Sequence, residues 1–369
     1  MADRVLDLPQ GRFELVRRPD RARSQLRAWD AADAYLARHF DEQPVVGTLG
    51  IVNDSYGALA CALAAHDPHV VADTAMARAG IAGNLERNGR AAGAVVSDVD
   101  QLPAALDTVV VRVPKTLGLL EDQLHLLRDH LAPGARVVAG GMVRDIHTST
   151  LDLFESILGP TVTSLAERRA RLIHPEWHPT LTPPINPWPM RWSHGGIDLV
   201  NRGGIFSARS IDIGTRLLLD HLPPSTGTVV DLGCGNGVLG IAVAQSEAVD
   251  QVHFVDASSR AVDSAQLSWT ANAATPEAVF HVAERLGAVV EPGSVDVVVN
   301  NPPFHEERAV GDGTAWDMFV DAHAALRRGG ELRVVANRQL GHHSRIRKIF
   351  GNCETVAANR KFVVLSAIR

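Results

Sequence analysis

The sequence has little cysteine, no long apolar run and no excess of positive charge. Its three cysteines, Cys61, Cys234 and Cys353, are too far apart for a metal-binding motif or a disulfide framework, so we expect no metal. No apolar stretch approaches the roughly 18 residues that a membrane-spanning helix needs. The first residues mix charges and are not typical of a signal peptide. We therefore expect a cytoplasmic protein without a membrane partner.

The formal net charge of −6 excludes a global basic field of the kind that attracts nucleic acid. Any such contact must come from a local patch. Residues 338–369 are a candidate, because they hold seven lysines and arginines against one acid, Glu354. A solvated basic face that balances acids elsewhere explains the same pattern equally well.

Proline is concentrated in residues 174–196, which contain six of the 20 prolines and three tryptophans, Trp177, Trp188 and Trp192. Neither a helix nor a strand ladder is expected at that density. We interpret residues 174–199 as a connector that packs between two domains, residues 1–173 and 200–369.

The two halves of the chain resemble each other. The second half predicts strands at residues 228–233, 251–256, 278–283, 295–300, 331–337 and 361–368, with helices at 237–245, 259–273 and 316–326. Near-continuous apolar strands that alternate with helices indicate a parallel sheet covered on both faces. The first half repeats the pattern about 180 to 195 residues earlier, and its leucines at 117, 120, 124, 127 and 131 predict one buried helix face. The fold class is therefore α/β, with two tandem Rossmann-like domains.

The clearest ligand signal is the loop DLGCGNG at residues 231–237, between a strand and a helix. Gly233 and Gly235 allow a close approach to the ligand, and the helix start offers free amides. Asp256 ends the next strand, where a carboxylate accepts ribose hydroxyls. Asp231 is placed to bind a cationic amino group. Ribose, ammonium and sulfonium together indicate S-adenosyl-L-methionine, and Cys234 reads as a small space-filler in the loop.

The corresponding loop of the first half, IVNDSYG, has Ile51 in place of the acid and Asn53 and Ser55 in place of two glycines. The first half also has VPK where the second has NPP. We interpret it as a degenerate copy that has lost the cofactor.

The strand at residues 295–300 ends in a rigid elbow, NNPPFH at residues 300–305, because neither proline has an amide proton to donate. This elbow, the glycine loop and the segment GGIFSARSIDIGTRLLLDHL together resemble class I S-adenosylmethionine-dependent N-methyltransferases. Among these the chain is similar to the ribosomal RNA guanine-N2 methyltransferases. The segment VRVPKTLGLLEDQLHLLRDHL resembles the large-subunit (23S) enzymes more than the small-subunit (16S) ones.

The resemblance implies a seven-stranded sheet in each half, an RNA-recognising first domain and a catalytic second domain. Ribosomal RNA is the expected partner, and the oligomeric state stays open, a monomer being compatible with the sequence. The expected cofactor-binding residues are Asp231, Gly233, Cys234, Gly235, Asp256, Ala257, Glu284, Asn300 and Phe206.

Chemistry gives the elbow a role of its own. The lone pair of a guanine amine is delocalised into the ring, so the amine is a poor nucleophile. If the Asn301 side-chain oxygen and the Pro302 carbonyl accept its protons, the lone pair is directed at the methyl group. Phe304 would stack on an unpaired or flipped base, and Pro303 and His305 would contact the substrate.

Two alternatives remain open from sequence. The same elbow serves methylation of adenine N6 and of protein glutamine, although those families more often have tyrosine at the position of Phe304. A non-catalytic RNA-binding or ribosome-assembly module is the other, and the intact loop and elbow argue against it. Glu306 and Glu307 add negative charge beside the expected RNA site and leave the RNA pose open.

Overall fold

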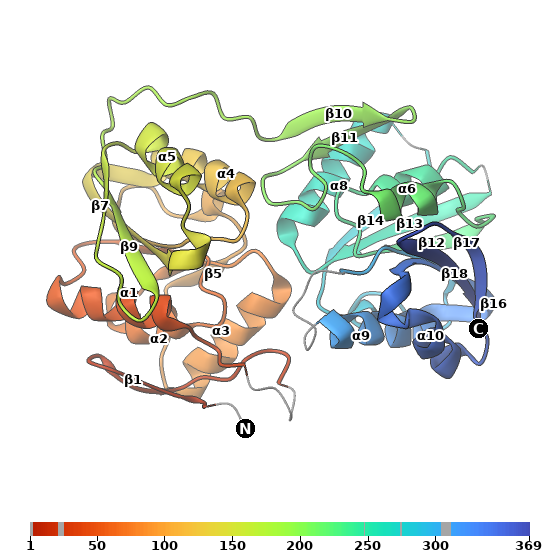
Figure 1. Ribbon diagram of the computed structural model, residues 1–369, viewed down its shortest axis with the longest axis horizontal. Coiled ribbons are helices and arrows are strands. Elements are labelled where there is room, and N and C mark those ends of the chain that lie inside the picture. The colour runs from red at the N-terminus through yellow and green to blue at the C-terminus, as the bar shows by residue number, and fades with distance from the viewer. Residues whose placement is uncertain (1–2, 21–25, 247, 274, 304–310) are drawn as a thin grey trace. The chain divides into compact units, whose positions relative to one another are not determined.

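The computed structural model describes residues 3–20, 26–246, 248–273, 275–303 and 311–369. The chain divides into two compact units, Met1–Trp188 and Pro189–Arg369, each built around one seven-stranded sheet (Figure 1). The tandem α/β architecture predicted from the sequence is therefore confirmed.

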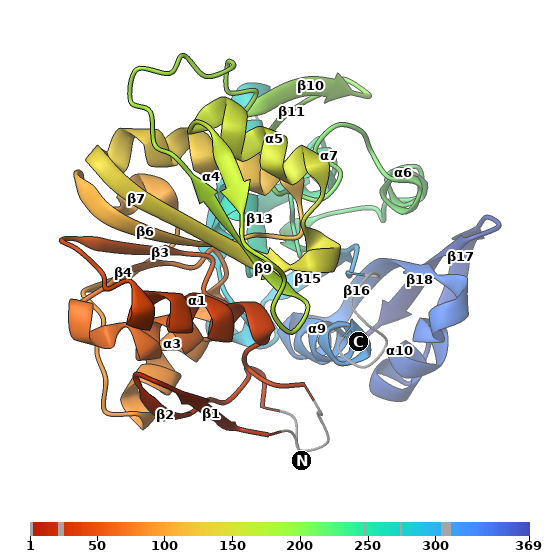
Figure 2. The ribbon, with the colours of Figure 1, turned by 60° about the vertical axis from the view of Figure 1, so that its left-hand side comes forward.

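The sheet of the first unit has the strand order β5-β4-β3-β6-β7-β9-β8 (Figure 2). Neighbouring strands from β5 through β4, β3 and β6 to β7 are parallel. Strand β9 is antiparallel to both of its neighbours, β7 and β8. The strands are β1 (Val5–Leu8), β2 (Gly11–Glu14), β3 (Leu49–Val52), β4 (His69–Val71), β5 (Ala94–Val96), β6 (Leu106–Arg112), β7 (Leu131–Met142), β8 (Thr161–Thr163) and β9 (Ala170–Pro175). The helices are α1 (Ala31–Glu42), α2 (Ala58–Ala62), α3 (Ala75–Arg87), α4 (Leu117–Leu127) and α5 (Thr148–Ile157).

Two apolar cores cover the faces of this sheet. Helices α1, α2 and α3 and the β1–β2 hairpin bury Leu36, Leu59 and Phe13 on one face. Helices α4 and α5 bury side chains such as Leu124 and Phe154 on the other. The predicted leucine face is confirmed for Leu120, Leu124 and Leu127, whereas Leu117 at the start of α4 is exposed and Leu131 already begins β7.

The second unit repeats the same order as β14-β13-β12-β15-β16-β18-β17. Its main strands are β12 (Gly227–Leu232), β13 (Val249–Asp256), β14 (Glu277–Val282), β15 (Val295–Asn300), β16 (Leu326–Asn337), β17 (Glu354–Ala358) and β18 (Phe362–Ile368). A separate hairpin joins β10 (Met190–His194) to β11 (Ile197–Asn201). The helices are α6 (Ile213–Leu219), α7 (Val238–Val243), α8 (Ser259–Asn272), α9 (Gly311–Ala325) and α10 (His342–Phe350).

Helices α6, α7 and α8 cover one face of the second sheet, and α9 and α10 cover the other (Figure 1). Helix α7 lies close to β13 because Gly240 has no side chain. A Cβ atom at Gly240 would lie 2.2 Å from Cε1 of the Phe254 ring. This close packing sets the direction of the helix that follows the glycine loop.

All six strands predicted for the second half are present, but strand β17 and helices α6 and α10 were missed. The expectation that residues 174–196 form no strand ladder is wrong, because β10 pairs with β11. The physical reason is local. The last proline of the segment, Pro189, precedes Met190, and residues 190–201 contain no proline to interrupt pairing.

The carboxyl end of β6 is tied to the start of α1 by a buried ion pair. Arg112 Nε lies 2.7 Å from Asp33 Oδ1, and its Nη2 lies 3.0 Å from Asp30 Oδ2. Burial raises the pKa of Asp33 to about 6, although the Arg112 guanidinium opposes the rise. The carboxylate therefore depends on Arg112 to remain ionised at neutral pH.

We expect Arg112→Met to lower the free energy of unfolding by about 3–5 kcal/mol near pH 8, because it leaves a buried carboxylate without its counter-charge. Without Arg112 the pKa of Asp33 rises further. A raised folded-state pKa gives stability that is present at low pH and lost as pH rises, so the loss should be smaller at pH 5. Urea unfolding at both pH values measures it, with the exposed Arg4→Met as control. Equal losses at both pH values would refute the pairing.

Candidate active site at the carboxyl edge of the second sheet

Four parallel strands bring the predicted site residues to one edge of the second sheet. Leu232 of β12 is in register with Val255 of β13 and with Asn300 of β15. Asp256 of β13 is in register with Val282 of β14. Strand β12 is followed in sequence by β13 on one side and flanked by β15 on the other. Such a switch in strand order leaves a crevice outside the carboxyl ends, where open α/β sheets bind ligands.

The glycine loop turns sharply away from β12. Gly233 and Gly235 have φ angles of +71° and +54°, in the left-handed region that favours glycine. The Gly233 amide donates to the Val255 carbonyl at 2.7 Å, which holds the loop to the next strand. A Cβ atom at Gly235 would meet no heavy atom of the described residues within 4 Å. The loop therefore leaves space for a ligand at Gly235.

Asp231 is buried beneath this loop, with 1% of its surface exposed. Its Oδ2 accepts a hydrogen bond from the Gly240 amide at 2.8 Å and so fixes the first turn of α7. Its Oδ1 is buried and has no hydrogen-bond partner among the described residues. Burial raises the pKa of Asp231 to about 8, and the charge of Asp256 adds to the rise. A cationic group placed at Oδ1 would remove this penalty.

Asp256 is held by backbone amides on both sides. Its Oδ2 accepts from the Gly235 amide at 3.1 Å, and its Oδ1 accepts from the Ser258 amide at 2.9 Å. Ala257 follows directly. The Ala283 amide donates to the Asp256 carbonyl at 2.9 Å, which places Glu284 at the same edge.

Two further predicted residues are buried in the loop region. Burial raises the pKa of the Cys234 thiol well above its ordinary value, which disfavours the reactive thiolate. Asn300 is fully buried and donates to the Leu232 carbonyl at 2.6 Å. Its Oδ1 is buried and has no partner among the described residues.

Asn301 is fixed by two residues of the segment that starts α6. Its Nδ2 donates to Thr215 Oγ1 at 2.7 Å and to Asp212 Oδ2 at 3.4 Å. The Thr215 hydroxyl donates its own proton to the Asp212 carboxylate. We call Asp212, Thr215 and Asn301 the amide clamp.

The clamp determines which end of the Asn301 amide is free. A hydroxyl has one proton, and that of Thr215 goes to Asp212, so its oxygen can only accept from Asn301. The amide nitrogen must therefore face Thr215. The opposite end, Oδ1, is a buried acceptor with no partner among the described residues.

The sequence analysis did not single out Thr215, and Asp212 entered it only within the segment GGIFSARSIDIGTRLLLDHL. A local signal for two of the three clamp residues, Asp212 and Thr215, was present in the sequence. Asp212 caps α6, accepting from the Gly214 amide at 2.8 Å, and Thr215 occupies the third position of that helix. An aspartate followed three residues later by a polar side chain is a helix-start pattern.

The other residues of the elbow and Phe206 complete the set of predicted site residues. Pro302 is buried and Pro303 is exposed, while Phe304 and His305 lie outside the described residues. Phe206 is 57% exposed.

The corresponding edge of the first unit is occupied by its own side chains. Asn53 and Gln123 exchange two hydrogen bonds of 2.8 Å where the second unit has Gly233. Asp54 accepts from the Gly57 and Ala60 amides, both at 2.8 Å. Val113 stands where the second unit has Asn301, so the first unit has no counterpart of the free acceptor.

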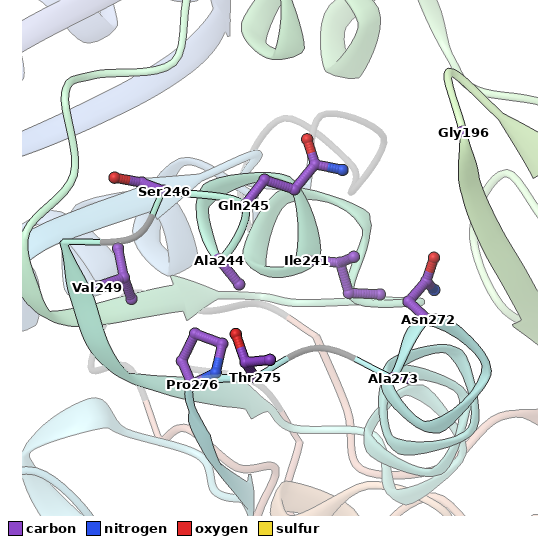
Figure 3. A pocket seen from close by; sticks show the side chains of 10 residues that line it. All are labelled: Gly196, Ile241, Ala244, Gln245, Ser246, Val249, Asn272, Ala273, Thr275 and Pro276. Carbon is purple, nitrogen blue, oxygen red and sulfur yellow. The ribbon is translucent and has the colours of Figure 1, made fainter.

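A separate hollow of about 310 Å³ lies at the opposite edge of the second sheet (Figure 3). It is lined by residues near the end of α7, the end of α8 and the starts of β13 and β14, among them Gln245, Val249, Asn272 and Pro276. Of the described residues that line it, none is an acid or a base, and none is a predicted site residue.

Among the described residues, no group of histidine, cysteine, aspartate and glutamate is arranged to hold a metal ion. A search of the same residues for a helix with the length and apolar character to cross a membrane found none.

The fold and the edge just described define a class I methyltransferase architecture. Residues 3–179 match the family described as the RLMG N-terminal domain, and residues 196–366 match the methyltransferase small domain. The solved structure of RsmC, a 16S rRNA N2 methyltransferase of T. thermophilus in complex with AdoMet and guanosine, aligns with a TM-score of 0.75. The alignment covers 99% of this chain and 97% of that one, at 22% identity.

Curated relatives identify the particular family. The ribosomal RNA large subunit methyltransferase G of Streptomyces griseus is 49% identical, and the alignment covers 98% of each chain. That of Aeromonas hydrophila is 45% identical over 99% of each chain. The chain belongs to the ribosomal RNA large subunit methyltransferase G family, which confirms the predicted resemblance to the large-subunit enzymes.

We expect Asp231→Asn to stabilise the ligand-free protein at high pH. The wild-type carboxyl has a raised folded-state pKa, so its contribution is present below about pH 4 and lost as pH rises to about 8. Asparagine keeps an acceptor for the Gly240 amide and does not ionise. Thermal unfolding from pH 5 to 8.5 should show the variant's Tm rising relative to wild type. Parallel curves, as expected for the exposed control Asp250→Asn, would show that Asp231 does not ionise in this range.

Proposed function

We propose that the second unit transfers a methyl group from S-adenosyl-L-methionine to the exocyclic N2 amine of a guanine in large-subunit (23S) ribosomal RNA. The observation that carries the proposal is the amide clamp, which presents the Asn301 oxygen as a fixed acceptor beside the Pro302 carbonyl. The names of the relatives support ribosomal RNA as the substrate class, and the solved complex with guanosine supports the base.

The residues present fit S-adenosyl-L-methionine. The unpaired Asp231 Oδ1 suits the ammonium group, and Asp256 at the end of β13 suits the ribose hydroxyls. The open space at Gly235 suits close approach of the ligand to the loop. We place Gly233, Cys234, Ala257, Glu284, Asn300 and Phe206 around the same ligand. When bound, S-adenosyl-L-methionine supplies a methyl group attached to a sulfonium sulfur. Loss of the methyl group converts the sulfonium into a neutral thioether.

The chain's own contribution is to orient the amine. The Asn301 Oδ1 and the Pro302 carbonyl each accept a hydrogen bond from one N–H of the amine. These two bonds direct the nitrogen lone pair away from both oxygens. The methylated nitrogen is acidic and gives up one proton to solvent, so no strong base is required. Catalysis then rests on alignment of the reacting atoms. Phe304 would stack on the base, with Pro303 and His305 on the substrate side.

An adenine N6 amine or a glutamine amide would meet the same two acceptors. The ribosomal RNA relatives, which extend over the whole chain, favour RNA over protein. We propose an RNA-recognition role for the first unit, because Asn53, Gln123 and Asp54 fill the place of its cofactor loop.

We expect Gly235→Ala to weaken binding of S-adenosyl-L-methionine by at least about 10-fold, because the new methyl group enters the space reserved for the ligand. The positive φ should cost only about 1–2 kcal/mol of stability. Gly134→Ala is the matched control, since Gly134 has φ +80° and no heavy atom near an added Cβ, in the first unit. Calorimetry measures both affinities, and equal affinities would remove the loop from the binding site.

We expect Asn301→Ala to lower kcat by about 10²–10³-fold with cofactor affinity unchanged, as for loss of one positioned transition-state contact. Thr215→Val keeps the shape of the side chain and removes the hydroxyl that orients the amide. It should lower kcat by about 10-fold or more, the equivalent of about 1.4 kcal/mol. Thr215→Ser should restore activity.

Single-turnover methylation of ribosomal RNA with radiolabelled cofactor measures these variants. Retained activity in Asn301→Ala would remove this residue from the mechanism. Equal activity of the Thr215 valine and serine variants would mean that the hydroxyl does not orient the amide.

A further inference from the structure

Three exposed cations gather at the same sheet edge as the amide clamp. Strand β16 is parallel to β15, so its end at Asn337 lies at the edge where β15 reaches Asn300. Asn337 pairs with Phe362, the first residue of the antiparallel β18. Arg338, which follows β16, and Arg360 and Lys361, which precede β18, therefore lie together at this edge. We call these three residues the basic turn.

The basic turn is linked to the amide clamp through Phe362 and Gly214. Phe362, next to Lys361, packs against the first turn of α6, because a Cβ atom at Gly214 would lie 3.3 Å from the Phe362 ring. The Gly214 amide in turn donates to Asp212 at 2.8 Å. One layer of packed side chains thus separates Lys361 from the residues that hold Asn301.

The backbone of the basic turn is fixed by its own hydrogen bonds. Asn359 Oδ1 accepts from the Lys361 amide at 2.9 Å and from the Phe362 amide at 2.7 Å. The Arg338 amide donates to the Lys361 carbonyl at 3.0 Å, and its guanidinium donates to the Asn359 carbonyl at 3.0 Å. The three side chains are exposed to solvent on a backbone that these hydrogen bonds fix.

Within the part of the chain that the structure describes, no carboxylate pairs with the basic turn. Other arginines of this unit pair with acids, such as Arg285 with Asp321 and Arg327 with Asp296. No carboxylate of the described residues forms an ion pair with Arg338, Arg360 or Lys361, although the whole chain carries a net charge of −6. A fixed, unopposed cationic cluster beside a nucleobase site suits the phosphates that flank a flipped base.

We propose that the basic turn binds the RNA backbone next to the target nucleotide and positions that nucleotide over the elbow. The inference rests on the proposed function, because it takes the base to lie at Asn301. Phosphate contacts of this kind set the register of the RNA strand without reading its sequence. They release bound counterions, so affinity should fall as salt rises.

The test is a triple variant of the full chain, Arg338→Gln, Arg360→Gln and Lys361→Gln. The matched control removes three exposed arginines elsewhere in the unit, Arg191→Gln, Arg327→Gln and Arg328→Gln. Both variants lose the same charge. Anisotropy of labelled large-subunit ribosomal RNA fragments is measured over a series of salt concentrations, together with KM and kcat for methylation.

We expect the triple variant to raise KM for RNA by about 10-fold or more with kcat and S-adenosyl-L-methionine affinity unchanged. Its plot of log affinity against log salt should be shallower by about 0.7 per lost phosphate contact, or about two for three contacts. The control should keep the wild-type slope. Equal losses in both triple variants would mean that only overall charge matters, and wild-type behaviour of the basic-turn variant would also overturn the proposal.

The same series separates this inference from the proposed function. Full activity of Asn301→Ala would refute the function whatever the salt slopes show. If the triple variant keeps its RNA affinity but loses binding to a ribosomal protein, the basic turn recognises protein and the inference is wrong.

Discussion

The account depends on one constraint, the orientation of a single amide. An asparagine side chain can present either its oxygen or its nitrogen to a ligand, and only the oxygen can accept protons from an amine. Here the Asp212 carboxylate accepts a hydrogen bond from the Thr215 hydroxyl, and the Thr215 oxygen accepts one from the Asn301 nitrogen. The Asn301 oxygen is therefore the end that can face a ligand. The neighbouring prolines restrict the backbone at the same point. In the proposed function, this rigid elbow holds two oxygens where an amine needs them.

The first unit shows what the same scaffold does without that orientation. Its strand order is the same, and its β6 is also tied to the start of the helix that precedes the sheet, α1. The tie there is an ion pair, Arg112 with Asp30 and Asp33, and every partner is occupied. In the second unit the corresponding link is neutral at Asn301 and leaves buried acceptors at Asp231, Asn300 and Asn301. A closed network gives stability, whereas an open one is available for a ligand.

The sequence predicted those parts whose chemistry lies within one short segment. The glycine loop, Asp256 and the elbow could be found because each is contiguous and follows an apolar strand. The clamp could not be assembled in this way, because Thr215 and Asn301 are 86 residues apart and meet only when α6 packs against the sheet. Strand β17 was missed because its five residues, ETVAA, are mostly exposed and do not form a long apolar run. The β10–β11 hairpin was hidden by the prolines before it. Phe206, expected near the cofactor, is exposed, and its assignment stays a prediction.

The most direct test is a crystal structure of the full chain with S-adenosylhomocysteine and a short guanine-containing RNA. The account predicts the guanine N2 atom within hydrogen-bond distance, about 2.7–3.2 Å, of both Asn301 Oδ1 and the Pro302 carbonyl, with the Asn301 nitrogen still on Thr215. An amide turned so that its nitrogen faces the base, or a base amine held away from both oxygens, would contradict it.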